Sequence, residues 1–312
     1  MHKHAAIMSG STVSSKALAK KNISVTASYS SDEEPIQFQK KRKVCHQKEF
    51  YLGTSGYCYD HWKKGVFYPR GVDLFKFYSA EFDSVELNST FYRIPKLSTW
   101  KKWCHDSSPR PSFTYVVKAN QYFTHWRQLN VDDNFAERWH YFYEQGCKQL
   151  GDHLGPILFQ LPPKLTYSVD KLYALRAILP RDGRYVFEFR HASWYCQEIY
   201  DAMRSCNFCF AAIHIKNVKM WVGDLKDGWN PTLEGYQPCC DWGYYLRLHG
   251  SNGQYVGSYG EQCMEKLAKQ VVEWKRSGKN VYVMYNNTDD GRPPSAIVDL
   301  RLLQRSISRC DV

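Results

Sequence analysis

The sequence lacks any long apolar run, since no stretch of its 312 residues approaches the ~18 apolar residues of a membrane-spanning helix. It also lacks a glycine-rich dinucleotide turn and a phosphate-loop motif, the two common nucleotide-binding signatures. Its 11 cysteines are an odd number in a chain too long to depend on disulfides. We therefore expect a soluble, intracellular protein with reduced thiols and no membrane partner.

The positive charge of the chain is concentrated at its beginning. Residues 1–48 hold nine Lys or Arg and three acidic residues, so this segment carries +6 of the net charge of +11. The segment is rich in Ser, Thr and Lys and shows no sustained hydrophobic period, which predicts a disordered basic tail outside the fold. The rest of the chain is only mildly cationic, so its charge indicates a nucleic-acid partner weakly.

Two targeting interpretations of this tail compete. The first 31 residues contain no Asp or Glu, as in an organelle transit peptide, although Arg is missing as well. The cluster KKRKV at residues 40–44 instead resembles a nuclear-import signal. A solvated charge run is the third interpretation, so the localisation, organelle or nucleus, stays open.

From residue 49 to about 310 the chain alternates strand-like and helix-like segments, which predicts a single α/β domain. Eight buried strands covered by helices favour a closed TIM-type (β/α)8 barrel over an open sheet. Residues 216–241 interrupt the rhythm and are interpreted as a long loop or lid. The predicted strands are 50–55, 84–88, 113–119, 155–161, 184–190, 208–214, 244–250 and 281–287. The predicted helices are 73–82, 98–105, 134–150, 170–179, 197–206, 261–277 and 294–307.

Polar residues follow one another at the ends of these strands, where the active sites of such barrels lie. Residues two apart on a strand share a face, so three strands each deliver a polar pair to one place. Burying these charges is costly unless they form ion pairs or bind a ligand. The alternative to a functional site is a set of ion pairs that only fix the strand register. The pairs are Glu86 with Asn88, Glu188 with Arg190, and Arg247 with His249; single residues from other strands are Lys118, Gln160, Asn286 and Asn287.

The loops that follow these strands add further candidates for substrate binding. Their aromatic and imidazole rings could stack on a ligand or orient it, although each alone is more often a packing residue. The candidates are Tyr57, Tyr92, His125, His191 and Trp194.

Seven short motifs occur in order along the body of the chain: GTSGYCY at 53–59, VELNSTFY at 85–92, Lys118 with Thr124 and His125, LFQLPP at 158–163, EFRHASW at 188–194, RLHG at 247–250 and YNN at 285–287. Together they resemble the YecE-like family, the domain of unknown function seventy-two. The resemblance implies a TIM-type barrel and a site built from these motifs, but no particular reaction. The chain departs from the family pattern in its tail, in residues 216–241, and at His214, where many relatives end the sixth strand in Asp.

The strand-end residues point to acid–base chemistry on an anion. Glu86 and Glu188 supply two carboxylates, and His249 or His125 could transfer a proton near neutral pH. Lys118, together with the two strand-end arginines, favours a substrate that carries phosphate or carboxylate. We expect a hydrolase- or lyase-like enzyme with Glu86, Glu188, His249 and Lys118 as catalytic residues and a small anionic, phosphorylated or sugar-like substrate.

Other functions stay open on the sequence. A metal held by two carboxylates and an imidazole is disfavoured because the neighbouring cations repel it, and a lone CxxC at 206–209 offers too few ligands, so we predict neither metal nor cofactor. The competing class is a nucleic-acid-binding or nucleic-acid-processing protein whose basic tail contacts phosphates. A third interpretation is a non-catalytic scaffold.

Overall fold

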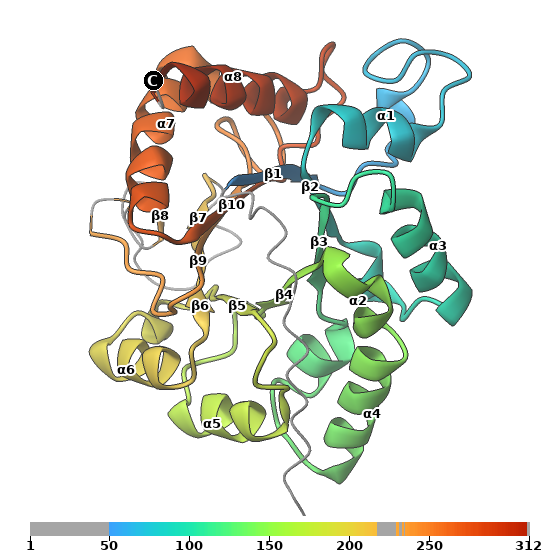
Figure 1. Ribbon diagram of the computed structural model, residues 1–312. Coiled ribbons are helices and arrows are strands. Elements are labelled where there is room, and N and C mark those ends of the chain that lie inside the picture. The colour runs from blue at the N-terminus through green and yellow to red at the C-terminus, as the bar shows by residue number, and fades with distance from the viewer. Residues whose placement is uncertain (1–49, 217–228, 231–232, 234, 311–312) are drawn as a thin grey trace, which may run out of the picture. The chain divides into compact units, whose positions relative to one another are not determined.

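The structure is a computed structural model that describes residues 50–216, 229–230, 233 and 235–310. The predicted tail and most of the predicted lid lie outside the described residues. The rest forms a ring of parallel strands surrounded by helices (Figure 1). The strands are β1 (Phe50–Ser55), β2 (Ser84–Leu87), β3 (Thr114–Lys118), β4 (Leu154–Gln160), β5 (Tyr185–Glu188), β6 (Cys209–Phe210), β7 (Ala212–His214), β8 (Trp229–Asn230), β9 (Gly243–Leu248) and β10 (Asn280–Tyr285).

The ring closes through an interrupted strand. The sheet runs β6-β5-β4-β3-β2-β1-β10-β9-β7-β8, and every pair is parallel except β7 with β8. β6 and β7 are separated only by Ala211, whose amide donates to the carbonyl oxygen of Phe187 at 2.9 Å. Since β6 pairs with β5 while β7 pairs with β9, the two halves act as one strand that joins both ends of the sheet. The predicted TIM-type barrel is confirmed.

Helices follow most of the barrel strands, as the sequence predicts. Asp73 caps the first of them, because its carboxylate accepts a hydrogen bond of 2.7 Å from the amide of Lys76. In the part of the chain that the structure describes, no helix is long and apolar enough to span a membrane. The α-helices are α1 (Leu74–Glu81), α2 (Ser89–Tyr92), α3 (Leu97–Ser107), α4 (Asp133–Glu144), α5 (Val169–Ile178), α6 (Gln197–Ser205), α7 (Gly260–Arg276) and α8 (Ser295–Cys310), and shorter helical turns are η1 (Asp60–Trp62), η2 (Tyr122–Trp126), η3 (Cys147–His153) and η4 (Ala192–Trp194).

The long helix predicted over residues 134–150 is wrong in its second half. α4 ends at Glu144, and Gly146 leaves the helical conformation with φ −121° and ψ −95° before η3 begins. A Cβ at Gly146 would lie 2.3 Å from the carbonyl oxygen of Phe142, so this turn requires glycine. Gly151, which the sequence suggests as the terminator, instead lies inside η3 with φ +57°.

The interior of the ring is divided along the barrel axis. Side chains alternate between the ring interior and the surrounding helices, because successive strand residues point to opposite faces. The outer faces pack against the helices in one large apolar core, in which four tryptophans are fully buried. A second, smaller apolar cluster, which includes Tyr51, Tyr245 and Tyr282, lies on the inward faces of the strands. The half of the interior where the strands end is polar, and this half contains the candidate site.

Candidate active site

The centre of the site is a bidentate ion pair between Glu86 on β2 and Arg247 on β9. Arg247 Nε lies 2.9 Å from Glu86 Oε2, and Arg247 Nη2 lies 2.6 Å from Glu86 Oε1. The Ser55 hydroxyl donates to Glu86 Oε1 at 2.8 Å, and the Tyr245 hydroxyl donates to Glu86 Oε2 at 2.9 Å. Each carboxylate oxygen therefore accepts two hydrogen bonds, which compensates the burial of a carboxylate that is 0% exposed.

Glu188, the last residue of β5, joins this pair to a second arginine. Its Oε2 accepts a hydrogen bond from Arg247 Nη1, and its Oε1 accepts from Arg190 Nε at 2.5 Å. Burial alone would raise the pKa of Glu188, but the guanidinium groups of Arg190 and Arg247 outweigh it and hold this pKa well below its usual range. Glu188 is thus a carboxylate at any physiological pH.

His249 lies at the edge of this charge network. Its Nε2 is 3.5 Å from Arg190 Nη2, and its Nδ1 is 3.1 Å from the side-chain amide of Asn286. Burial lowers the pKa of His249 far below its usual value, and the charges of Arg247 and Arg190 lower it further. The ring is therefore neutral, so one of its nitrogens carries the proton and the other can accept a hydrogen bond.

Lys118 at the end of β3 differs from the two arginines in having no carboxylate partner in the part of the chain that the structure describes. Its Nζ donates to Gln160 Oε1 at 3.0 Å and lies 4.3 Å from the centre of the Phe91 ring. No Asp or Glu oxygen of the described residues lies within 4.0 Å of it, the limit for an ion pair. Burial, and secondarily the charge of Arg247, lower the pKa of Lys118 to about 8. Lys118 thus loses its proton much more readily than an ordinary lysine.

His125, which belongs to η2, lies next to this lysine. Its Nδ1 is 2.9 Å from the Thr124 hydroxyl, and its ring packs edge-on against Phe91 at 4.9 Å. Burial and the positive charge of Lys118 lower its pKa to about 4. His125 is accordingly a neutral group at the border of the site.

Several predicted ligand-binding residues lie elsewhere. Trp194 is buried in the outer core, where it stacks on Phe189 at 4.4 Å and donates from Nε1 to the Leu165 carbonyl at 2.7 Å. His191 caps η4 through the Ser193 amide at 3.1 Å. Both residues lie beyond the end of β5, in η4 and at its N-cap, so the strand alternation that turns Glu188 into the ring does not determine their direction.

Three further candidates are also outside the network. Asn287 donates to Asp299 Oδ2 in α8 at 2.7 Å and to the Gly257 carbonyl in the loop after β9 at 2.9 Å, so it links that loop to α8. Tyr57 packs against the rings of Phe75 and Tyr78 in the outer core. Tyr92 is 73% exposed on the surface.

Two positions at the margin have distinct environments. Asn88 donates from Nδ2 to the Ser55 carbonyl at 3.3 Å, while its buried Oδ1 has no hydrogen-bond partner among the described residues. His214 faces the Tyr259 hydroxyl at 2.9 Å, because Ile213 is the residue of β7 that faces the ring interior. The departure from the family pattern at His214 therefore does not alter the Glu86–Arg247 network.

The sequence did not single out Tyr245 as a site residue. Its hydroxyl completes the shell around Glu86, and its position two residues before Arg247 on the same strand face was the available signal. Tyrosine at that position reads equally well as an apolar core residue, and Tyr245 is indeed also part of the inner apolar cluster.

The carboxylates of the site are bound by arginine side chains. Among the residues that the structure describes, no group of three or more His, Cys, Asp or Glu side chains is arranged to hold a metal ion. The oxygens of Glu86 and Glu188 accept hydrogen bonds from arginine, which occupies the positions that a cation would take.

Known proteins share this architecture. The family model described as "Protein of unknown function DUF72" matches residues 51–308. The chain belongs to the DUF72 family. UPF0759 protein YunF of Bacillus subtilis (strain 168) is 26% identical over 262 residues, which cover 77% of this chain and 89% of that protein. This relative agrees with the YecE-like resemblance of the sequence motifs.

Solved structures of DUF72 proteins have the same fold. A family protein from Thermotoga maritima MSB8 superposes with a TM-score of 0.66 at 28% identity, covering 84% of this chain and 100% of that chain. A family protein from Enterococcus faecalis V583 superposes with a TM-score of 0.62 at 17% identity, covering 85% of this chain and 99% of that one. The family name states no activity, so the reaction has to be argued from the site.

Proposed function

We propose that this DUF72 protein is an enzyme that acts on a small anionic, phosphorylated or sugar-like substrate by acid–base chemistry at the mouth of its barrel. The charge balance of the buried site carries the proposal. Three cations, Arg190, Arg247 and Lys118, lie near two carboxylates, Glu86 and Glu188, and Lys118 has no carboxylate within ion-pair distance among the described residues. An anionic substrate group would balance this excess positive charge.

In the simplest mechanism for two carboxylates, one donates a proton and the other accepts one. The contacts of Glu86 and Glu188 favour other roles. Glu188 is held ionised by Arg190 and Arg247, so it cannot donate a proton near neutral pH. In this proposal Glu86 and Glu188 hold Arg247 in place, and Lys118, whose pKa is about 8, transfers the proton. His249 is the second proton-transfer candidate, because a bound anion would raise its pKa from the low value that burial and the two arginines impose. Hydrolysis and elimination both require such a group.

Binding of inorganic phosphate tests the role of Lys118. We expect phosphate to bind measurably by calorimetry at pH 7 and at least tenfold more weakly at pH 9.5, where Lys118 is largely neutral. Lys118→Met should weaken binding at pH 7 by a similar factor and remove most of the pH dependence, while Lys118→Arg should retain binding. Lys63→Met is the matched control, since Lys63 is a surface residue paired with Asp60.

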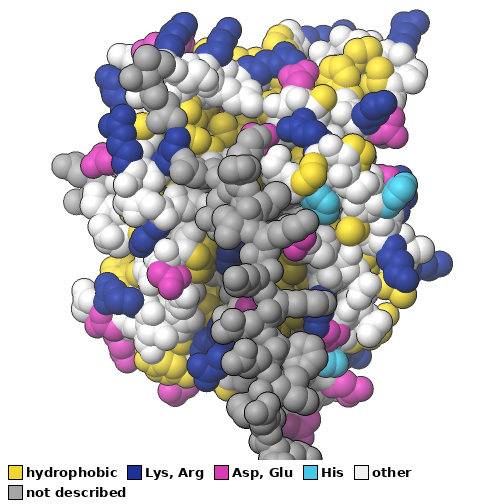
Figure 2. All heavy atoms as spheres, in the orientation of Figure 1, with side chains coloured by type: hydrophobic (Ala, Val, Ile, Leu, Met, Phe, Trp, Pro, Cys, Tyr) yellow, Lys and Arg dark blue, Asp and Glu magenta, His cyan; other side chains and the backbone are white. Residues whose placement is uncertain are grey.

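Three outcomes separate this function from its alternatives. Equal phosphate affinity in the wild type and Lys118→Met contradicts the proposal. Binding of a single-stranded oligonucleotide with a steep salt dependence, but no binding of phosphate, supports the nucleic-acid alternative. Figure 2 gives that alternative little support on the face it shows, where the Lys and Arg side chains are spread over the margins and the middle and alternate with Asp and Glu. Absence of binding to either probe supports the scaffold.

A further inference from the structure

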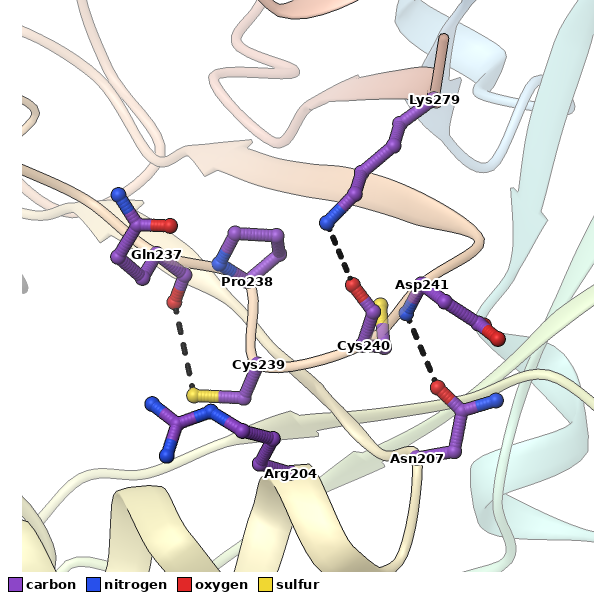
Figure 3. Close-up of a pocket in the computed structure, with 8 residues that line it drawn as sticks. All are labelled: Arg204, Asn207, Gln237, Pro238, Cys239, Cys240, Asp241 and Lys279. Atoms are coloured by element: carbon purple, nitrogen blue, oxygen red, sulfur yellow. Dashed lines mark hydrogen bonds between the residues drawn. The ribbon is translucent and has the colours of Figure 1, made fainter. Parts of the chain in front are cut away.

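A pocket of about 530 Å³ opens at the opposite end of the barrel from the candidate active site. The pocket lies where three strands begin. Its wall includes Asn207, two residues before β6, Asp241, two residues before β9, and Lys279, directly before β10. Figure 3 shows the two adjacent thiols of Cys239 and Cys240 at its wall. The remaining lining residues are Arg204, Gln237 and Pro238.

A third thiol lies behind the pocket wall. Cys209, the first residue of β6, is fully buried in the inner apolar cluster together with Cys240. The sulfur atoms of both residues approach one acceptor, the carbonyl oxygen of Gly243, at 3.6 Å for Cys209 and 3.1 Å for Cys240. Both sulfur atoms therefore lie against the same backbone oxygen within one buried cluster. Cys240 thus connects the pocket with a buried second thiol.

The two thiols differ in how easily they ionise. Burial raises the pKa of Cys209 well above its usual value. Burial also raises that of Cys240, but the neighbouring Cys209 thiol, the backbone at Gly243 and the charge of Lys279 outweigh burial and lower the pKa of Cys240. Burial raises the pKa of the neighbouring Cys239 to about 11. Of the three, Cys240 is the thiol most able to attack as a thiolate.

We propose that Cys240 and Cys209 are a redox-active thiol pair that a small disulfide of the glutathione type oxidises through this pocket. The Cys240 thiolate attacks one sulfur of the small disulfide, so that a mixed disulfide forms and one glutathione thiolate leaves. Cys209 then loses its proton and attacks the Cys240 sulfur, which forms the Cys209–Cys240 disulfide and releases the second glutathione. The protein loses two electrons and two protons, and the small disulfide gains them.

The charges of the pocket suit an anionic disulfide. Arg204 and Lys279 lie on its wall, and the Lys279 ammonium donates to the Cys240 carbonyl at 2.8 Å, directly beside the attacking residue. Asp241 is the one acidic residue of the lining, and its amide is held by the Asn207 side chain at 3.0 Å (Figure 3). The carboxylates of glutathione disulfide would meet the two cations near the entrance.

Oxidation of the full chain tests the pair. The folded protein is incubated with glutathione disulfide, quenched in acid, alkylated and digested, and the peptides are identified by mass spectrometry. We expect a peptide that links Cys209 to Cys240, reversed by dithiothreitol. Cys209→Ser should stop at one glutathionyl group on Cys240, and Cys240→Ser should remove both products.

Cys239→Ser is the matched control, because it removes the adjacent thiol and should leave the 209–240 link in place. Circular dichroism and thermal unfolding establish that each variant is folded before it is compared. The proposal is overturned if the folded protein gives no 209–240 link and the link appears only after unfolding in urea. It is also overturned if Cys209→Ser carries glutathione on Cys239 and not on Cys240. Neither result depends on phosphate binding at the other end of the barrel.

Discussion

The two halves of the barrel interior are built on the same strands but stabilised by different interactions. On β9, Tyr245 belongs to the apolar cluster near the strand starts, while Arg247 lies among the charges near the strand ends. In the apolar half, Tyr51 and Tyr282 stack with ring centres 4.6 Å apart. In the charged half, fully buried carboxylates and guanidinium groups contact one another directly.

This contrast indicates that the charged half does more than stabilise the barrel. Aromatic and aliphatic packing stabilises a barrel without any need for exact charge placement. A buried ion-pair network is at best neutral against apolar residues of similar size, because both partners lose their hydration. The charged half is therefore not explained by stability alone, which agrees with an active site at the strand ends.

Removal of Arg247 should have the largest effect on the charged half. We expect Arg247→Met to lower the free energy of unfolding by about 3–5 kcal/mol, because Glu86 and Glu188 would remain buried without their shared partner. Urea unfolding measures the loss. The triple variant Glu86→Gln, Glu188→Gln, Arg247→Met should recover more than half of it, since no unpaired charge is left.

The matched control is a surface pair of the same chemistry. Arg301 contacts Glu81 through two nitrogens at 3.0 and 2.9 Å, but its side chain is 47% exposed. Arg301→Met should therefore reduce the free energy of unfolding by at most about 1 kcal/mol. Equal losses for Arg247→Met and Arg301→Met would show that the buried network is not desolvated.

Removing one tyrosine hydroxyl from each half of the barrel interior compares the two halves through smaller changes in the free energy of unfolding. Tyr245→Phe removes a hydrogen bond to the buried Glu86 carboxylate and should lower the free energy of unfolding by about 1.5–3 kcal/mol. Tyr282→Phe removes a bond from Arg184, which still donates to the Leu154 carbonyl, so the loss should be about 1 kcal/mol. Urea unfolding of both variants checks the order, and the reverse order would contradict the assignment of the charged half.

The fold was predictable because its signals are local and repeated. Alternating apolar strands and capped helices recur along the chain, and Asp73 caps α1 as its position predicts. The break after α4 was not predictable from the same pattern, since it depends on Gly146 lying against the Phe142 carbonyl in the folded chain. A tertiary close approach leaves no periodic signal in the sequence.

The candidate site was predictable where strand alternation determines direction. Glu86, Glu188, Arg190, Arg247 and His249 all occupy inward positions, so their convergence follows from the barrel itself. Their pairing did not follow, because the choice of Arg247 and not Lys118 as partner of Glu86 depends on distances across the ring. The positions of the loop candidates were less predictable, because nothing in the sequence distinguishes a packed ring such as Trp194 from one at the border of the site such as His125.

The pH dependence of stability tests the one cation that the network leaves without a carboxylate partner among the described residues. The pKa of Lys118 is about 8 in the folded protein and 10.5 as its ordinary value. Between these values the unfolded chain binds more protons, so Lys118 makes the free energy of unfolding rise with pH across this window. At pH 7 the wild type bears the full penalty of a buried ammonium, which the Lys118→Met variant lacks.

The free energy of unfolding of the wild type should therefore rise relative to that of Lys118→Met between pH 7 and pH 10, as measured by urea unfolding. The shift should be on the order of 1 kcal/mol, less than full burial would give, because the side chain keeps some contact with solvent. For Lys63→Met the difference in the free energy of unfolding should change with pH in the opposite direction, since Asp60 raises the pKa of Lys63. A difference between the wild type and Lys118→Met that is constant with pH would mean that this lysine is ordinarily solvated, and the charged half would then lack the unbalanced cation on which substrate binding depends.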